Sequence, residues 1–135
     1  MVKNNADLDQ CDIFCSDPEK VSEVKRRLHG ISLETELFKA LSDETRFKLV
    51  YALWQEELCV CDLALALDLP IAAVSYHLRY LRSLKLVKAK KKGKMVFYKL
   101  ADQRAASMVN LSLEFTTANF KPGGDVSKNN DTRND

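Results

Sequence analysis

The residues from Cys59 to Leu84, CVCDLALALDLPIAAVSYHLRYLRSL, are the strongest indication of the fold that we expect for this chain. A short apolar segment, 61–67, runs into the turn 68–70 and then into a longer segment, 71–84. Two helices joined by a turn of three or four residues, with polar and basic residues on the second, are typical of a helix-turn-helix. In the longer segment apolar residues recur at the spacings of three and four that an amphipathic helix has; they are Ile71, Val74, Leu78, Leu81 and Leu84.

The residues behind this motif predict a basic β-hairpin. Residues 86–90 alternate between apolar and basic side chains, and residues 95–100, MVFYKL, are rich in aromatic and β-branched side chains. Between them, Lys91-Lys92-Gly93-Lys94 is the expected turn. A basic hairpin directly after a recognition helix is a wing. The predicted fold class is therefore mainly α with a small β-hairpin, a winged helix-turn-helix.

Capping residues predict four further helices and the limits of the domain. We expect residues 1–18 to be a flexible N-terminal arm and residues 19–118 to be the folded domain. Residues 119–135 are rich in Gly, Asn, Asp and Ser, and we expect them to be disordered. The expected start signals are Asp17-Pro18-Glu19 for a helix over 19–28, Ser32 or Thr35 for the next, Ser42-Asp43-Glu44 for the third, and Asp102 for a last helix over 103–118.

Positive charge is concentrated in one segment. Residues 69–101 hold nine of the chain's 21 Lys and Arg and no Asp or Glu, so the rest of the chain has twelve basic residues against all 19 acidic ones. Such segregation favours a polyanionic partner, because cationic side chains that neutralise phosphates release counterions. A solvated basic face is the alternative.

Size and composition indicate one globular domain in a reducing compartment. A chain of 135 residues with 46% hydrophobic content can bury one core. It has no apolar run of the roughly 20 residues that cross a bilayer and no apolar signal-peptide core over residues 1–10. We therefore expect a cytoplasmic protein with no membrane partner. In a reducing cytoplasm, four cysteines are more often metal ligands or free thiols than a disulfide framework.

Three runs of residues resemble the ArsR/SmtB family of metal-sensing winged-helix repressors: ELCVCDL at 57–63, SYHLRYL at 75–81 and GKMVFYKL at 93–100. The run KALSDETR at 39–46 is similar to an early helix of that family, and the resemblance covers residues 34–118. The run CDIFC at 11–15, ahead of the fold, resembles the CadC-type branch, whose members respond to cadmium, lead and zinc. Lys85 stands where the family usually has a glycine after the recognition helix.

The resemblance implies a homodimeric repressor that binds operator DNA without metal and is released by metal ions, which switches on genes for metal efflux or resistance. In this branch the arm of one subunit reaches the Cys-Val-Cys helix of the other, and both cysteine pairs bind the inducer ion, which is Cd²⁺, Pb²⁺ or Zn²⁺. No organic cofactor is implied. The implied metal ligands are Cys11, Cys15, Cys59 and Cys61.

Related sensors often carry a second zinc site on the last helix. We do not expect that site here, because Arg104 takes the place of a histidine beside Asp102 and no histidine follows His77.

Thiolates select soft ions, with zinc as a borderline case. Cys59 and Cys61 would point to nearly opposite sides within a continuous helix, so they can share an ion only if Cys59 lies at or before the helix start. Cys11 and Cys15 could converge on one helical turn or in a loop. The alternatives are that the cysteines are small core or incidental residues, or that they hold a permanent structural zinc ion.

We predict DNA contacts on the second helix of the helix-turn-helix and on the wing. His77 is expected to pack within the protein or to contact DNA, and the alternative for Tyr76 is packing on the protein surface. The predicted DNA-binding residues are Ser75, Tyr76, His77, Arg79, Arg82, Lys90, Lys91, Lys92 and Lys94.

The alternatives to this function are a different inducer, a redox response and an enzyme. The same fold could sense arsenite or antimonite through the Cys-Val-Cys region, or it could respond to oxidants through the same cysteines. An enzyme such as a thiol oxidoreductase is not expected, because the chain has no Cys-x-x-Cys, no βαβ pattern and no nucleophile–histidine pair.

Overall fold

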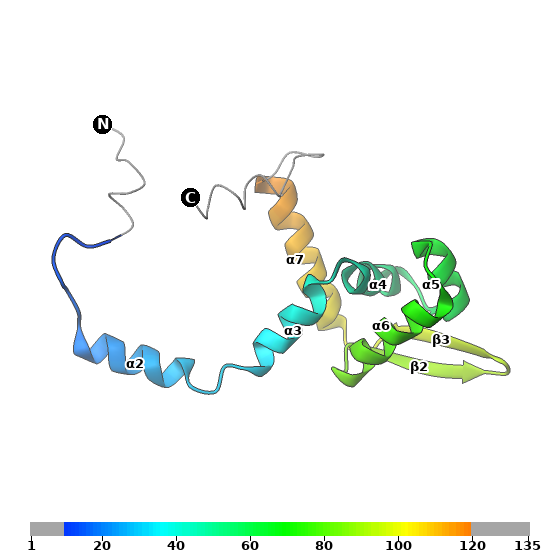
Figure 1. Cartoon of the computed structure of the whole chain (residues 1–135), viewed down its shortest axis with the longest axis horizontal. Helices are drawn as coiled ribbons and strands as arrows, with labels where there is room; N and C mark the ends of the chain where they lie inside the picture. Colours follow the sequence, from blue (N-terminus) through cyan, green and yellow to red (C-terminus); the bar gives the residue numbers. More distant parts are fainter. Residues whose placement is uncertain (1–9, 120–135) are drawn as a thin grey trace. The chain divides into compact units, whose positions relative to one another are not determined.

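The computed structural model describes residues 10–119, and the chain divides into two units, Met1–Thr35 and Glu36–Asp135. The first nine residues of the predicted arm and the predicted tail from 120 onward lie outside the described residues. Over the described residues the elements follow the order α-α-α-β-α-α-β-β-α (Figure 1).

The first unit holds helix α2 (Pro18–Leu28), which begins at the predicted capping signal. The Asp17 carboxylate accepts hydrogen bonds from the backbone N–H of Glu19 at 3.1 Å and of Lys20 at 3.3 Å. Gly30 follows the helix with a φ of +91°, a left-handed conformation that glycine adopts without strain. The described α2 buries none of its side chains, and its predicted apolar stripe is exposed; the stripe comprises Val21, Val24 and Leu28.

The second unit contains the predicted helix-turn-helix. It includes α3 (Leu33–Ser42) from Glu36 onward and the whole of α4 (Glu44–Gln55). The Asp43 carboxylate caps α4 by accepting from the backbone N–H of Arg46 at 3.0 Å. The helix-turn-helix itself is α5 (Val60–Leu67) and α6 (Ile71–Ser83). These two helices are bent by 112° relative to each other, within the range typical of the motif. Asp68 ends α5 in a left-handed conformation with φ of +54°.

Lys85, which follows α6, has the left-handed backbone conformation that glycine adopts most easily, which accounts for the glycine usually found at this place in similar sequences. Lys85 has a φ of +62°, and its backbone N–H bonds to the carbonyl of Arg82 at 2.9 Å. A left-handed residue at this place ends α6 and sends the chain into the hairpin. Lysine adopts this conformation at a cost that glycine does not have.

The predicted hairpin is confirmed, with a tighter turn. β2 (Val87–Lys92) and β3 (Met95–Leu100) are antiparallel, and Val87 lies opposite Leu100. The prediction that Lys91 and Lys92 are turn residues is wrong, because both continue β2. Gly93, with φ of +61°, and Lys94 alone form the turn. A two-residue turn that begins in this left-handed region matches the twist of the paired strands.

A third strand was not predicted. β1 (Leu58–Cys59) pairs with β3, so the sheet order is β1-β3-β2. Two residues carry no detectable period, and their strand character comes entirely from the pairing.

The core lies between the helix-turn-helix, α4, the sheet and the last helix, α7 (Gln103–Asn119). From the predicted stripe of α6, Val74, Leu78 and Leu81 are fully buried, whereas Ile71 is 50% exposed because the first turn of the helix extends beyond the core. Within residues 10–119, no single helix is long and apolar enough to cross a membrane; α5 and α6 taken together, with their bend, meet that criterion by length and composition.

Candidate metal centre and nucleic-acid interface

The two thiols of the Cys-Val-Cys run lie where strand β1 passes into helix α5. Cys59 is the N-cap of α5, with extended backbone (φ −80°, ψ 160°), and its side chain is buried. Cys61 lies in the first turn of the helix and is exposed. Cys59 therefore precedes the helix, which is the condition for two thiols at this spacing to face one ion.

The arm thiols already lie close together. Cys11 and Cys15 are exposed, and their sulfur atoms are 3.4 Å apart. A tetrahedral ion with metal–sulfur bonds of about 2.3 Å holds its sulfur atoms about 3.8 Å apart. The pair needs only a slight opening to ligate one soft ion, so its donor chemistry fits the implied metal.

Neither thiol pair forms a closed site alone. Among residues 10–119, no three His, Cys, Asp or Glu side chains come together in a group that could hold an ion. A closed tetrahedral site takes four ligands, and each pair supplies two. A four-sulfur site therefore needs both pairs, and the assignment of all four cysteines as ligands stays a prediction.

The recognition helix α6 turns most of its predicted contact residues outward. Tyr76 is 59% exposed, Arg79 and Arg82 are exposed, and Ser75 is half-buried. Side chains of this kind, on a helix that stands free on one side, can reach base edges and phosphates. Their DNA contacts remain predictions.

His77 differs from its neighbours because it faces the protein. Its Nδ1 is 3.3 Å from Nη1 of Arg46, and the ring is half-buried. An arginine nitrogen can only donate, so a hydrogen bond between the two groups needs Nδ1 as its acceptor. Sequence reasoning missed Arg46, which also donates from Nε to the Ala40 carbonyl at 2.8 Å and lies 4.6 Å from the centroid of the Tyr80 ring.

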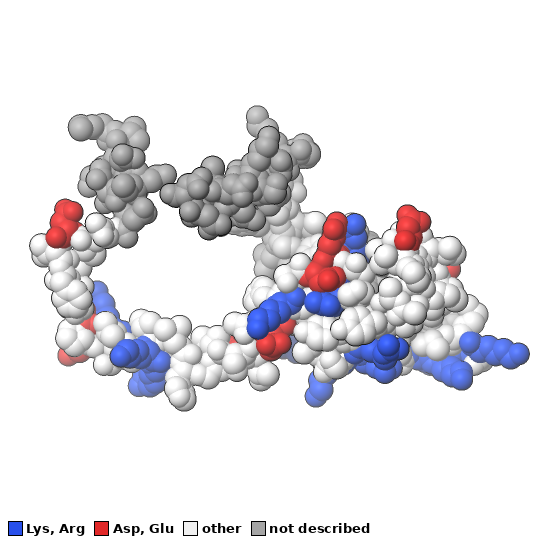
Figure 2. Space-filling view, viewed as in Figure 1, with Lys and Arg blue, Asp and Glu red and all other residues white. Residues whose placement is uncertain are grey.

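One face of the hairpin carries four lysines, which we call the wing face: Lys88, Lys90, Lys92 and Lys99. The three on β2 are alternate residues and share a face, and Lys99 lies directly opposite Lys88. Like charges directly opposite each other destabilise a sheet, so this face is suited to an anionic partner. Lys94 lies in the turn, and Lys91 lies on the other face of β2. Figure 2 shows Lys and Arg side chains gathered along the edge formed by α6 and the hairpin.

Sequence reasoning missed Lys88 and Lys99 as members of this face. The alternation of residues 86–90 was a signal that could have identified Lys88. Lys99 needed the cross-strand register, which the sequence does not contain.

Lys92 is tied to the segment that leads to the thiols. Its Nζ lies 2.8 Å from Oε1 of Glu57 and 4.8 Å from the centroid of the Phe97 ring. The hydrogen bond from Lys92 is the main cause that lowers the pKa of the Glu57 carboxyl, and the charges of Lys99 and Lys90 act in the same direction. Glu57 was not among the predicted site residues.

The carboxylate at the start of α7 is engaged by its neighbour. Nε of Arg104 lies 3.1 and 3.0 Å from the two oxygens of Asp102. The guanidinium lowers the pKa of Asp102 to about 2. Arg104 thus binds both carboxylate oxygens of Asp102, which a metal ion at the last helix would need as ligands.

Helices α3 and α7 expose apolar side chains on a shared surface, which we call the seam surface: Phe38, Met108, Leu111 and Phe115. Phe38, Leu111 and Phe115 are each more than 60% exposed, and the four residues line an open hollow of about 650 Å³. Contiguous exposed apolar surface of this kind marks protein interfaces.

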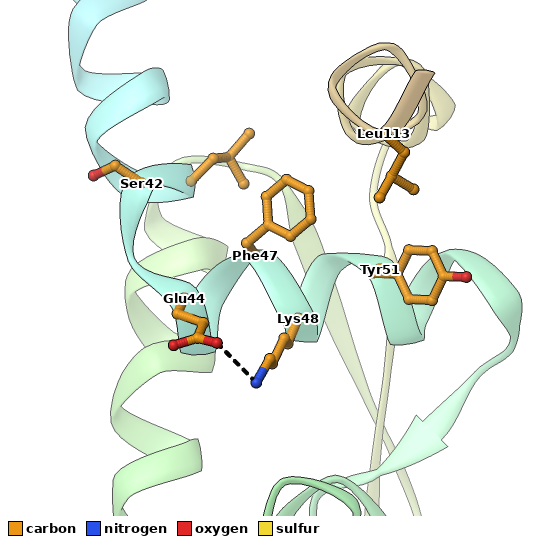
Figure 3. Close-up of a pocket in the computed structure, with 7 residues that line it drawn as sticks. Ser42, Glu44, Phe47, Lys48, Tyr51 and Leu113 are labelled. Carbon is orange, nitrogen blue, oxygen red and sulfur yellow. Dashed lines mark ion pairs between the residues drawn. The ribbon is translucent and has the colours of Figure 1, made fainter. Parts of the chain in front are cut away.

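A second hollow, of about 480 Å³, lies over α4. Figure 3 shows the rings of Phe47 and Tyr51 and the side chain of Leu113 around it, with the Glu44–Lys48 ion pair at its margin. Nζ of Lys48 and Oε1 of Glu44 are 3.0 Å apart, so each charge is paired with the other. The lining offers apolar contact without the convergent polar groups that fix a small ligand.

Comparison with known proteins relates these features to regulators of transcription. The profile of a family described as "Bacterial regulatory protein, arsR family" matches residues 43–89. The cadmium resistance transcriptional regulatory protein CadC of Listeria innocua is 38% identical over 108 residues, which are 78% of this chain and 91% of the relative. The arsenical resistance operon repressor of Escherichia coli is 47% identical over 70 residues, 51% of this chain and 60% of the relative. Among solved structures, HlyU from Vibrio cholerae has a TM-score of 0.60 and 31% identity over 65% of this chain and 96% of that one.

Proposed function

Because this chain belongs to the arsR family of bacterial regulatory proteins, we propose that it is a metal-responsive transcriptional repressor. Without metal it binds operator DNA, and Cd²⁺, Pb²⁺ or Zn²⁺ releases it so that metal resistance genes are transcribed. It works in the cytoplasm by binding and not by catalysis. The observation that supports this most directly is the thiol of Cys59, which is buried at the N-cap of the first helix of the helix-turn-helix.

The proposed DNA-binding form is a homodimer joined through the seam surface. Each subunit inserts α6 into a major groove, with Tyr76 and Arg79 toward base edges or phosphates. The wing face and Lys94 lie along the phosphate backbone, where they add affinity for any sequence. The two α6 helices read successive half-sites of the operator.

The proposed inducer site combines the thiols of the arm with those of the Cys-Val-Cys run. Bound there, the ion ties the arm to the start of the helix-turn-helix. It lowers DNA affinity only if the dimer it prefers differs from the dimer that DNA prefers, and linkage then makes DNA lower metal affinity by the same factor. Coupling of about 1–3 kcal/mol is usual for such linked sites.

The test is a fluorescence anisotropy titration of the ion-free protein on its upstream promoter DNA, with and without Cd²⁺, Pb²⁺, Zn²⁺ and arsenite. We expect the apparent Kd to rise between about five- and 150-fold with the effective ion. Cys59→Ser and Cys61→Ser should abolish this rise and leave ion-free binding in place. A variant with all four cysteines replaced by serine that still leaves the DNA on addition of Cd²⁺ would contradict the proposal.

Arsenite or antimonite sensing is the alternative inducer, favoured by the similarity to the arsenical resistance operon repressor. Arsenite takes three thiolates, so one of the four cysteines would then be dispensable. Single Cys→Ser variants at positions 11 and 15, titrated with arsenite and with Cd²⁺, separate the two ions.

Redox sensing is the other alternative, favoured by the 3.4 Å separation of the exposed Cys11 and Cys15 sulfurs. It predicts release from DNA by hydrogen peroxide in chelated, metal-free buffer, with reversal by a dithiol reductant. Release by Cd²⁺ in the presence of that reductant points to the metal.

A further inference from the structure

Strand β1 places the Cys59 thiol against the wing. Cys59 lies directly opposite Phe97 of β3, and Leu58 lies opposite Tyr98. Directly opposed residues of an antiparallel pair project from the same face of the sheet, with Cβ atoms about 5 Å apart. Phe97 in turn lies opposite Lys90. The side chain of Cys59 therefore projects from the same side of the sheet as the lysines of the wing face.

Three residues connect this thiol to the wing lysines, and we call them the wing anchor: Glu57, Lys92 and Phe97. The Lys92 ammonium lies over the Phe97 ring and bonds to the Glu57 carboxylate. Glu57 precedes Cys59 by two residues, and Phe97 is the partner of Cys59 in the ladder. Glu57 and Phe97, the two residues that Lys92 contacts, therefore both lie near Cys59, the residue that is proposed to bind the ion.

The recognition helix is held much more firmly than this anchor. Val74, Leu78 and Leu81 of α6 are fully buried in close-packed core, which resists small displacements. The side chains of the Lys92–Glu57 pair are 49% and 33% exposed, and β1 has only two residues. A shift of Cys59 is thus transmitted more easily into the sheet than into α6.

We propose that the wing anchor couples Cys59 to the wing, so that an ion taken up at Cys59 lowers DNA affinity first by displacing the wing lysines. Glu57 and Lys92 are positioning residues in this account: Glu57 holds the Lys92 side chain and β2 in the orientation that meets phosphate. The coupling to the ion rests on the proposed function, whereas the positioning of the wing does not.

The first experiment measures the affinity of the ion-free protein for promoter DNA in Glu57→Ala and Glu56→Ala. Glu56 is the exposed neighbour, and its replacement removes the same negative charge. Charge alone predicts that both variants bind DNA more tightly. The wing anchor predicts that Glu57→Ala binds about two- to fivefold more weakly, a change typical of an exposed ion pair, while Glu56→Ala binds equally or more tightly.

A double-mutant cycle with Lys92→Met separates positioning from a general loss of fold. In the Lys92→Met background Glu57 has no partner to hold, so Glu57→Ala should no longer weaken binding. Weakening of the same size in both backgrounds overturns the proposal, and so does equal behaviour of Glu57→Ala and Glu56→Ala. Thermal unfolding of each variant checks that the fold is kept.

The second experiment follows backbone amide hydrogen exchange when Cd²⁺ is added to the full chain without DNA. For the unmodified protein, we expect Cd²⁺ to raise the exchange rate more in β2 and β3 than in α6. For Cys59→Ser, we expect Cd²⁺ to change neither rate. Glu57→Ala should show raised exchange in the hairpin before the ion is added and little further change after it. A response in α6 with none in the hairpin overturns the proposal.

The two proposals fail in distinguishable ways. If no ion changes the operator affinity of the unmodified protein, the proposed function is wrong, while ion-free affinity and hydrogen exchange still decide whether the wing anchor exists. If ions release the unmodified protein and release Glu57→Ala by the same factor as Glu56→Ala, only the coupling through the wing anchor is wrong.

Discussion

Arg46 on α4 contacts both α3 and α6 through its guanidinium. Its Nε donates to the Ala40 carbonyl near the end of α3, its backbone N–H is capped by Asp43, and its Nη1 meets His77 on α6. The guanidinium also lies over the ring of Tyr80, one turn further along α6. A planar group with several donors can make these contacts together, and a point charge cannot.

Replacing Arg46 should therefore affect both stability and DNA binding. We expect Arg46→Ala to lower the free energy of unfolding by about 1.5–3 kcal/mol, the range for hydrogen bonds to a charged group, and to weaken operator binding. Arg46→Lys should recover only part of either loss. Denaturant unfolding and anisotropy measure the two effects, with Lys48→Ala, expected to cost about 0.5 kcal/mol or less, as the control. Full recovery by lysine would contradict the role of the planar fork.

Asp43 is a helix cap with a stability effect that depends on pH. Its pKa is lowered chiefly by the hydrogen bond from the Arg46 backbone N–H; burial opposes this shift, and the charges of Arg46 and His77 add to it. A carboxyl whose pKa is lower in the folded state stabilises that state above its unfolded pKa of about 3.9. The contribution is lost as the pH falls through the folded value.

We expect Asp43→Ala to cost about 1 kcal/mol of unfolding free energy at neutral pH. Asp43→Asn keeps a cap without the charge, so it should cost less. The difference between the unmodified protein and Asp43→Asn should shrink as the pH falls below about 3.9. Urea unfolding over that pH range measures the two free energies of unfolding. If their difference stays constant in acid, the charge of Asp43 does not contribute to the stability of the cap.

At the scale of elements, the wing is where position in the sheet matters more than composition. The segment from Lys90 to Lys94 contains four lysines in five residues, yet the register puts them in different settings. Lys90 and Lys92 belong to the wing face, Lys91 to the opposite face and Lys94 to the turn. Lys88, on the same strand, and Lys99, on the strand that pairs with it, complete the wing face.

Removing charge from the wing face should weaken binding to every DNA sequence. We expect Lys88→Gln with Lys99→Gln to raise the Kd for operator and random DNA by similar factors. The slope of log K against log salt should fall by about 0.9 for each phosphate that is no longer neutralised. Anisotropy at several salt concentrations measures the slope, and Lys20→Gln with Lys25→Gln on α2, which removes the same two charges, serves as the control for net charge. Weakening confined to operator DNA would show that these lysines read sequence instead.

At the scale of the whole molecule, the seam surface is an apolar surface that a single copy of the chain leaves exposed to water. A second copy that covers it would remove Phe38, Leu111 and their neighbours from water at about 25 cal/mol per Å² of apolar surface. Symmetric pairing through one surface is also the commonest form of small oligomer.

We expect Leu111→Glu to convert a dimer into monomers and to reduce operator affinity by about tenfold or more, because two linked half-site contacts become one. Sedimentation velocity at several concentrations measures the first effect. Leu65→Glu on α5 introduces the same charge at a position that is 77% exposed outside the seam surface. If Leu65→Glu dissociates the protein as readily as Leu111→Glu, the seam surface is not the interface.

Local sequence was sufficient to predict the helix-turn-helix and the hairpin, because the periods of apolar residues and the turn residues carry that information. That Cys59 precedes helix α5 was only a condition for a shared ion, and the structure supplied it. Local sequence also identified the family, through short runs such as CVC at 59–61 and SYHLRYL at 75–81.

The residues that meet across the sheet and between helices became known only from the folded chain. The pairing of Cys59 with Phe97, the ion pair of Glu57 with Lys92 and the contact of Arg46 with His77 join residues about 30 or more positions apart. No local pattern encodes such contacts, because they depend on the register of β1 on β3 and on the packing of α4 against α6. The sequence thus shows which residue types are available for metal and DNA binding, whereas the contacts behind the proposed coupling of Cys59 to the wing exist only in the folded molecule.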